Sequence, residues 1–474
     1  MTFTIGLIKA SLPSYFPEKH GVFEQAESAL GRLAAEEGAQ LVVASGVPMD
    51  ASQARQAMDV VLAQGADFVI LLHGGFTMGD VARVLASYDV PLGFWATPEP
   101  SHEGDIQLNN FVSLNMSMSI ARGVRDLQAS PVRWYFGAPD DAALQGVLRQ
   151  TIQALGMCTA LRGSRIGVVG GLAPTFYNMA VREEELFKRL GVEVEHVDMH
   201  QLTQAMTGFA GDAVARELTA MAAAADVDGV SDAQMNLTAR MVLALRELAK
   251  ANRYDALAVS DWPALQQDPG FHPGAAFSWL EEHDQIPVAS EGDVMGAVTQ
   301  LAVKAMTGQV GCLLDMTSPQ LAEDRILMWH GGGGPLYLAE RRARWINHPM
   351  IGRGTEQGPI YGAIADYCFA LGPVTVLRIG RSGASRFSFE AQVIKAPESG
   401  FTGCRGWVSG FAENGETRSA HDIVGAVLDH GVEHHFVLVS GHWNQVLAEF
   451  GEWSNLVTLD IAKRERNIGL SPRQ

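Results

Sequence analysis

The sequence of 474 residues contains few cysteines, few charged residues and no long apolar segment. Its cysteines, Cys158, Cys312, Cys368 and Cys404, lie far apart without a CxxC pair, which argues against a disulfide framework and favours a reducing, cytoplasmic setting. No apolar run approaches the ~18 residues of a membrane-spanning helix, so we expect none. The first residues lack a basic start, a long apolar stretch and a cleavage site, so we expect no secretory signal.

Basic residues are in the minority. The sequence has 53 Asp and Glu against 35 Lys and Arg, which gives a formal net charge of −18, and only 19% of its residues are charged. Because this charge repels the phosphates of nucleic acids and of anionic membranes, we expect neither as a partner. The hydrophobic share of 47% supplies ample core for a globular protein, and the length predicts two or three domains.

The common motifs of hydrolases and nucleotide-binding enzymes are also missing. The sequence has no GxSxG or HExxH motif and no zinc-type cysteine pairs. The run RIGVVGG at residues 165–171 begins like a dinucleotide-binding fold but lacks the GxGxxG spacing, and HGGGGP at 330–335 lacks the GxxxxGK[ST] pattern of a phosphate loop. These absences argue against a nicotinamide site and against the usual hydrolase chemistry.

Short apolar runs alternate with helical patterns through the first two thirds of the sequence. The apolar runs include TIGLIKA, AQLVVAS, DFVILLHGG, VPLGFWA, RIGVVGG, VEVEHVDM and YDALAVSD. The intervening patterns predict helices near residues 21–37, 52–64, 79–88, 114–128, 212–225, 236–251 and 294–306. Strands alternating with helices indicate parallel sheets covered on both faces, so we predict two α/β domains, at residues 1–160 and 161–330.

The pattern changes near Trp345 and becomes rich in β-structure. The runs GPVTVLRIG, RFSFEAQVIKA and FTGCRGWVSGF are joined by turn signals, and a helix near residues 419–429 and a His-rich strand follow. This predicts a small antiparallel barrel or sandwich over 331–474. The expected fold class is therefore α/β, with two doubly wound parallel-sheet domains of the Rossmann or flavodoxin type before a mostly β, barrel-like domain.

Three apolar runs between residues 286 and 335 end in a residue that can bind a metal. Glu291 follows IPVAS, Asp315 follows CLL, and His330 follows ILMW. If these runs are parallel strands, the three side chains meet at the edge of a sheet where open α/β folds place their ligands. A single acid at a strand end commonly only caps a helix or faces solvent. Two carboxylates and an imidazole together favour a site for a divalent cation such as Mn²⁺.

The strand VEHHFVLVSGH offers three further histidines. Adjacent strand residues point to opposite faces, so we expect only one of His434 and His435 to reach a given site. His442 faces away from His435 in a regular strand, but a bend at Gly441 could turn it back.

Four segments resemble the L-fucose and L-arabinose isomerase superfamily, in particular its fucose isomerase-like branch, and together they span most of the chain. They are DALAVSDWPALQQDPGFHPGAAFSWLEEHDQIPVASEGDVMGAVTQLAVKAMTG, QLNNFVSLNMSMS, GPVTVLRIGRSG and HHFVLVSGH. The resemblance implies that Glu291 and Asp315 bind Mn²⁺, or Co²⁺ or Mg²⁺, and assist proton transfer, and that His435 is the third metal ligand. His330 matches an extra metal-site histidine of the arabinose branch, whereas Asp315 matches the fucose branch. The DWP and HGGGGP motifs depart from the versions expected in relatives and leave the sugar open.

The resemblance implies an Mn-dependent aldose–ketose isomerase that works through a cis-enediol. In such a reaction one group removes a carbon-bound proton, another handles the hydroxyl proton, and the metal stabilises the developing oxyanion. An isomerase of a modified or anionic sugar, for example a sulfonated one, is the alternative on the same scaffold. A non-catalytic sugar-binding protein is a third possibility.

The remaining expectations concern the small-molecule sugar substrate and the assembly. The resemblance implies a homo-trimer or homo-hexamer in which the first domain of a neighbour closes the site. His330 is expected either as a metal ligand or as a substrate contact. The other candidates for substrate contacts are His442, Asn444, Asn236 and Trp95. Trp95 and four further residues at strand ends could face the sugar or simply pack: Tyr15, Phe16, His73 and Phe76.

Overall fold

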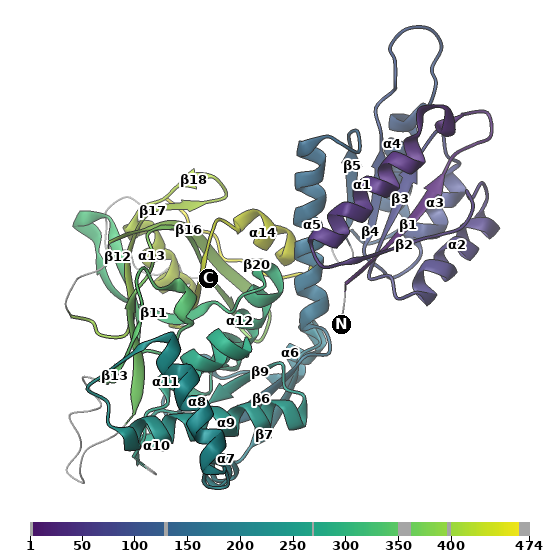
Figure 1. Ribbon diagram of the computed structural model, residues 1–474. Helices are drawn as coiled ribbons and strands as arrows, with labels where there is room; N and C mark the ends of the chain where they lie inside the picture. Colours follow the sequence, from purple (N-terminus) through teal and green to yellow (C-terminus); the bar gives the residue numbers. More distant parts are fainter. Residues whose placement is uncertain (1–2, 128–130, 268–269, 349–361, 396–399, 464–474) are drawn as a thin grey trace. The chain divides into compact units, whose positions relative to one another are not determined.

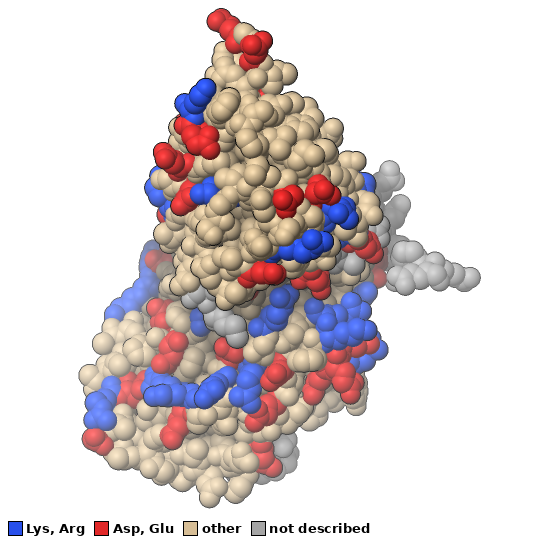
Figure 2. Space-filling view, turned by 90° about the vertical axis from the view of Figure 1, so that its right-hand side faces the viewer, with Lys and Arg blue, Asp and Glu red and all other residues tan. Residues whose placement is uncertain are grey.

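The computed structural model describes residues 3–127, 131–267, 270–348, 362–395 and 400–463 (Figure 1). The chain divides into two compact units. The first comprises Met1–Thr159 with Ala448–Asn455, and the second comprises Ala160–Leu447 with Leu456–Gln474. No helix in the described residues is long and apolar enough to cross a membrane. On the face shown in Figure 2, acidic and basic side chains are interspersed.

The first unit contains a five-stranded parallel sheet in the order β2-β1-β3-β4-β5. Its strands are β1 (Thr4–Ala10), β2 (Gln40–Val43), β3 (Phe68–His73), β4 (Leu92–Ala96) and β5 (Val132–Phe136). Its helices are α1 (Val22–Glu36), α2 (Ala51–Ala63), α3 (Gly79–Ala86), α4 (Asn110–Val124) and α5 (Ala142–Leu161). The sequence analysis anticipated each of these elements except β5 and the 20-residue α5.

The side chains of β3 show why this sheet needs helices on both faces. Val69 and Leu71 pack into one core with residues of α2, α3 and α4. Phe68, Ile70 and Leu72 point the other way and pack with residues of α1 and α5. A strand buried on both faces reads as a continuous apolar run, which is why the sequence analysis could predict FVILLH as a strand of a parallel sheet.

The second unit begins with a four-stranded parallel sheet in the order β10-β9-β6-β7. The strands are β6 (Arg165–Val169), β7 (Glu193–Val197), β9 (Ala256–Val259) and β10 (Val288–Ala289). The helices are α6 (Glu183–Leu190), α7 (Met199–Thr207), α8 (Gly211–Ala224), α9 (Asp232–Asn252), α10 (Ala264–Gln267), α11 (Gly274–Trp279) and α12 (Val294–Thr307), with short helical turns η2 (Tyr177–Met179) and η4 (Ser290–Gly292).

Six antiparallel strands of the second unit close into a barrel in the described part of the chain. The ring runs β16-β15-β19-β11-β12-β17 and returns from β17 to β16. Its strands are β11 (Cys312–Gln320), β12 (Arg325–His330), β15 (Gly372–Gly380), β16 (Ser385–Lys395), β17 (Cys404–Glu413) and β19 (His435–Ser440). The remaining strands and α-helices of the described chain are β8 (Asp226–Asp228), β13 (Arg344–Asn347), β14 (Ala363–Cys368), β18 (Glu416–Thr417), β20 (Val457–Thr458), α13 (Ala420–His430) and α14 (Asn444–Trp453). Two parallel sheets and a mostly β C-terminal region agree with the predicted fold class.

The expectation that three parallel strands carry Glu291, Asp315 and His330 is wrong. β11 and β12 are antiparallel, with Asp315 opposite Trp329, and both strands belong to the barrel rather than to the parallel sheet. The connection of residues 321–324 is too short for parallel strands, which need a crossover of about a dozen residues. The barrel therefore begins before the expected boundary at residue 330, because apolar runs alone do not reveal strand direction.

Helix α8 carries two arginine-paired carboxylates that differ in burial. Glu217 is only 8% exposed and accepts hydrogen bonds from Arg246, at 2.6 and 2.9 Å, and from the indole of Trp279. Asp212 pairs with Arg216 at 2.7 Å on the surface. Burial alone would raise the pKa of Glu217, but its bonds to Arg246 and Trp279 outweigh burial and lower it.

We expect Glu217→Gln to lower the free energy of unfolding at neutral pH by about 1–3 kcal/mol, because Arg246 then loses a buried charged partner. A lowered carboxyl pKa stabilises the fold above the ordinary value of ~4.3, and this contribution disappears as the pH falls through the lowered pKa. Urea unfolding from pH 7 to pH 2 should therefore show the two proteins converging in acid. The matched variant Asp212→Asn should leave the urea midpoint unchanged, and equal midpoints for all three proteins at pH 7 would contradict the prediction.

Candidate metal centre

Glu291 lies in the turn η4, and the surrounding backbone fixes its conformation. Its φ of 62° and ψ of 12° are left-handed, which is unusual for a residue other than glycine. Its N–H donates to Asp261 Oδ1 at 2.7 Å, and its carbonyl accepts from the N–H of Ala173 at 2.9 Å. The next residue, Gly292, packs so tightly that a Cβ would lie 2.1 Å from the carbonyl oxygen of Gly171. Strain held in this way is typical of functional sites.

Both histidines of the doublet reach Glu291. Glu291 Oε2 lies 3.5 Å from His434 Nε2 and 3.4 Å from His435 Nε2. One ligand atom from each of the three residues lies within 4.8 Å of the others. The structure thus differs from the expectation that only one histidine would face the site. His435 is the first residue of β19, so His434 precedes the strand and the alternation of strand side chains does not apply to it.

Asp315 joins this cluster through the barrel. It lies directly opposite His435 in the antiparallel pairing of β11 with β19, and its Oδ1 is 3.8 Å from His435 Nε2. Burial raises the pKa of Asp315, and the negative charge of Glu291 adds to this effect against the opposing influence of the two histidines. The barrel pairing therefore brings a second carboxylate to the histidine that Glu291 already contacts.

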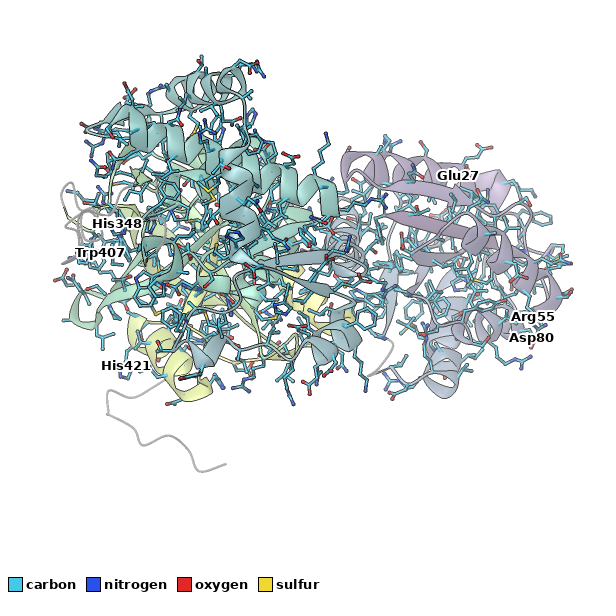
Figure 3. The ribbon with its side chains drawn as sticks, turned by 90° about the horizontal axis from the view of Figure 1, so that it is seen from below. Glu27, Arg55, Asp80, His348, Trp407 and His421 are labelled. Carbon is cyan, nitrogen blue, oxygen red and sulfur yellow. The ribbon has the colours of Figure 1, made fainter. Side chains whose placement is uncertain are left out.

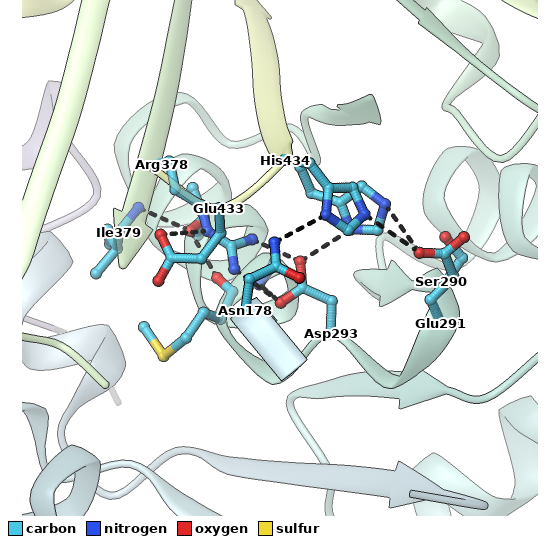
Figure 4. A network of polar contacts seen from close by, with 12 residues as sticks. Asn178, Ser290, Glu291, Asp293, Arg378, Ile379, Glu433 and His434 are labelled. Atoms are coloured by element: carbon cyan, nitrogen blue, oxygen red, sulfur yellow. Dashed lines mark hydrogen bonds and ion pairs between the residues drawn. The ribbon is translucent and has the colours of Figure 1, made fainter. Parts of the chain in front are cut away.

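Asp293 and Arg378 form a buried ion pair (Figure 4), and this pair orients His435. His435 Nδ1 lies 3.0 Å from Asp293 Oδ2, and Asp293 accepts two hydrogen bonds from Arg378, at 2.5 and 2.9 Å. Burial alone would raise the pKa of Asp293 and lower that of His435. The charge of Arg378 instead holds the pKa of Asp293 well below its usual range, and the bond to Asp293 raises the pKa of His435. A carboxylate at Nδ1 keeps the proton on that nitrogen and leaves Nε2 as the ligand atom.

The donor atoms of this cluster fit a divalent cation. Among the described residues, neither Glu291 Oε2 nor Asp315 Oδ1 has a hydrogen-bond donor, although both atoms are buried. A buried anionic oxygen without a partner is costly, and a cation would relieve that cost. Carboxylate oxygens combined with imidazole nitrogens form a donor set that suits Mn²⁺ and its neighbours. Glu291, Asp315 and His435 could hold the ion, with His434 as a fourth ligand.

His330 lies beside the cluster. Its ring centre is 5.9 Å from that of His435, and its Nε2 lies 3.2 Å from Ser290 Oγ. Burial lowers its pKa to about 3, with contributions from neighbouring histidines that include His435 and His348, so its ring is neutral near pH 7. His348, labelled in Figure 3, is buried and lies against His272 with ring centres 4.9 Å apart. In the described chain His330 Nδ1 has no hydrogen-bond partner, so this nitrogen remains available to a ligand.

The structure does not bring His442 and Asn444 to this cluster. They follow the far end of β19, whose six residues span roughly 17 Å at ~3.3 Å per residue. His442 contacts Gln392 at 3.2 Å, and Asn444 is buried at the start of α14, where its N–H donates to Glu390 at 3.1 Å.

Asn236 and Trp95 also have other partners. Asn236 lies on α9 and accepts a hydrogen bond from Arg240 at 2.9 Å. Trp95 is completely buried in the core of the first unit and donates to the carbonyl of Gly137 at 3.1 Å. Its side chain therefore packs within that unit, which is the second of the two possibilities named for Trp95 in the sequence analysis.

The sequence analysis missed Asp293 and Arg378, whose roles depend on a contact between residues 85 positions apart. One signal was present. Arg378 is the only charged residue in the apolar run GPVTVLRIG, and a lone charge in a buried strand needs a buried partner.

Comparison with known proteins gives relatives of one kind. The chain matches no family model. It is 26% identical over 409 residues to the sulfoquinovose isomerase of Priestia aryabhattai, covering 85% of this chain and 87% of that protein. It is 24% identical over 406 residues to the sulfoquinovose isomerase of Alkalicoccus urumqiensis, covering 85% and 86%. These similarities support the expected class of enzyme, a sugar isomerase.

A solved structure was also found. It is an ABC transporter solute-binding protein from Agrobacterium vitis with bound alpha-D-tagatopyranose, at 17% identity over 65% of this chain and 90% of that chain. Its TM-score of 0.17 is too low to support an argument.

We expect Asp293→Asn to weaken Mn²⁺ binding by about 10- to 100-fold, because the amide no longer fixes the proton on His435 Nδ1. Titration calorimetry on the metal-free protein measures this directly. The matched control is Glu281→Gln, which replaces another fully buried carboxyl of the same unit, outside the cluster, and should keep the wild-type affinity. Equal affinities in Asp293→Asn and wild type would show that the network does not act on the metal site.

Proposed function

We propose that this chain is an aldose–ketose isomerase that depends on a divalent cation, with Mn²⁺ as the expected ion, and that its substrate is a sulfonated sugar. The observation that carries the proposal is the placement of Glu291 and Asp315, which lie 3.4 and 3.8 Å from the same nitrogen of His435. Each has a buried oxygen to which no described residue donates a hydrogen bond. The sugar class is supported by the similarity to sulfoquinovose isomerases over 85% of the chain. The homo-trimer or homo-hexamer remains a prediction from the superfamily resemblance.

The reaction moves two hydrogens within the sugar, so it needs no external oxidant or reductant. A proton leaves C2 of the aldose and is returned to C1, while the hydroxyl proton at O2 is lost and O1 gains one, through a cis-enediol. A divalent cation bound at the cluster would polarise the carbonyl oxygen and stabilise the negative charge that develops on it.

The protein must supply two groups that accept and return these protons. Glu291 and Asp315 each bring to the cluster a buried carboxylate oxygen that has no hydrogen-bond partner among the described residues, so we assign the two transfers to this pair of carboxylates. His435 is held by Asp293 and does not exchange its Nδ1 proton with substrate. His330 is neutral, and its Nδ1 has no hydrogen-bond partner in the described part of the chain, so this nitrogen can donate to a substrate oxygen or accept from a substrate hydroxyl.

We expect the protein to convert a sulfonated aldose into its ketose with Mn²⁺ and to lose this activity in EDTA. Glu291→Gln should reduce turnover by about 10²-fold or more, because the amide cannot take up a proton. Chromatographic detection of the ketose, with the neutral aldose assayed in parallel and Glu281→Gln as the control variant, tests both parts. Full activity in Glu291→Gln would overturn the assignment, preference for the neutral sugar would correct the substrate class, and sugar binding without turnover would indicate a binding protein.

The two histidines predicted as substrate contacts provide an internal comparison. His330→Asn should lower turnover by about 10²-fold, as expected for a group that positions or protonates a substrate oxygen. His442→Asn should leave turnover unchanged, because His442 lies at the other end of β19. Steady-state kinetics on both variants checks this, and the opposite ranking would place the substrate at the other end of the strand.

A further inference from the structure

A group of aromatic rings adjoins the candidate metal centre and has not been used so far. Trp262 stacks on Phe176 with ring centres 5.7 Å apart, and Phe176 packs against His434 at 5.1 Å. His434 in turn faces Glu291 at 3.5 Å. The rings thus form a continuous surface that starts at the cluster and leads away from it. We call Phe176 and Trp262 the aromatic wall.

The wall is accessible, unlike the aromatic residues of the cores. Trp262 is 40% exposed, and Phe176 is half-buried. Exposed aromatic rings beside buried polar groups are typical of small-molecule sites, in which apolar walls supply contact area and a few polar groups fix orientation. The C–H faces of a sugar can pack on such rings while its hydroxyls remain free for polar groups.

The segments that carry the wall are also the ones that fix Glu291. Asp261, adjacent to Trp262, accepts the N–H of Glu291, and Ala173, three residues before Phe176, donates to the carbonyl of Glu291. The wall and the carboxylate are therefore held in register by the buried side chain of Asp261 and by a backbone hydrogen bond from Ala173.

The backbone next to Phe176 is strained. Thr175 has a φ of +77°, a left-handed conformation that is a clear outlier for a β-branched residue. Asn178, two residues beyond Phe176, hydrogen-bonds His434 Nδ1 at 3.1 Å. Strain of this kind persists only where surrounding contacts enforce it, and it concentrates at ligand sites.

We propose that Phe176 and Trp262 bind the carbon chain of the sugar beyond C2 and thereby set the affinity for substrate. Glu291 lies at one end of the wall, so a sugar with C1 and C2 at the carboxylates extends along the rings of His434, Phe176 and Trp262. The inference rests on the proposed function for the identity of the ligand. It assigns no proton transfer to the wall, so its loss should raise KM and spare kcat.

The test uses variants from both segments of the wall. Phe176→Leu and Trp262→Leu keep apolar volume but remove the ring, and each should raise KM by about 10-fold, the equivalent of one well-packed aromatic contact. kcat should stay within about threefold and the Mn²⁺ affinity should not change, since neither ring carries a ligand atom. Phe176→Tyr should restore the wild-type KM. The matched control is Trp134→Leu, which removes a 60% exposed indole from the first unit and should alter nothing.

A second readout separates this proposal from the proposed function. A sugar alcohol with the carbon chain of the substrate cannot isomerise, so its dissociation constant, measured by calorimetry on the Mn²⁺-loaded protein, reports binding without turnover. The difference between wild type and the leucine variants then gives the contribution of the wall. We expect the same ~10-fold weakening in both leucine variants. Unchanged KM and unchanged alcohol affinity would overturn the proposal. A fall in kcat and in Mn²⁺ affinity at constant KM would also overturn it, because the rings would then only support His434. If wild type shows no turnover but the sugar alcohol still binds less tightly to the leucine variants, the proposed isomerase activity is wrong and the proposal for the aromatic wall stands.

Discussion

The buried contact between Arg378 and Asp293 is the interaction on which the site depends. Both side chains are at most 1% exposed, so each is stable only because the other neutralises it. Arg378 comes from β15 of the barrel, and Asp293 caps the start of α12, which packs beside the parallel sheet. This buried ion pair therefore links the barrel to the helix beside the parallel sheet, and the same carboxylate orients His435.

Much of the fold follows from local sequence patterns, and the exceptions have physical reasons. Strands such as Phe68–His73 were recognisable because burial on both faces leaves a continuous apolar run. The direction of β11 and β12 was not, since an apolar run is the same in a parallel and an antiparallel sheet. Helix α5 escaped notice although it has 20 residues. Its sequence lacks charged residues at regular spacing, with Arg149 its only charge, so it shows little contrast between faces.

The site was predictable in part. Glu291, Asp315 and His435 could be named from their positions after apolar runs together with the family resemblance, and the structure brings them to one place. The prediction left His434 out of the site because it assumed that the strand, with its alternating side chains, already includes this residue. The partners of His435 were out of reach of any local pattern, because Asp293 lies 142 residues before it in sequence.

That separation would tie cation binding at the candidate site to the completion of the chain. Glu291 and Asp293 precede the barrel, whereas His435 enters on β19, one of the last strands of the chain. A chain still emerging from the ribosome can form the parallel sheet but lacks a complete set of ligands until the ring of strands closes. Bound cation would then stabilise only the finished protein, by an amount that grows with the ratio of free metal to its dissociation constant. The metal available in the cell would in this way stabilise molecules whose barrel has closed, and not those whose barrel is still incomplete.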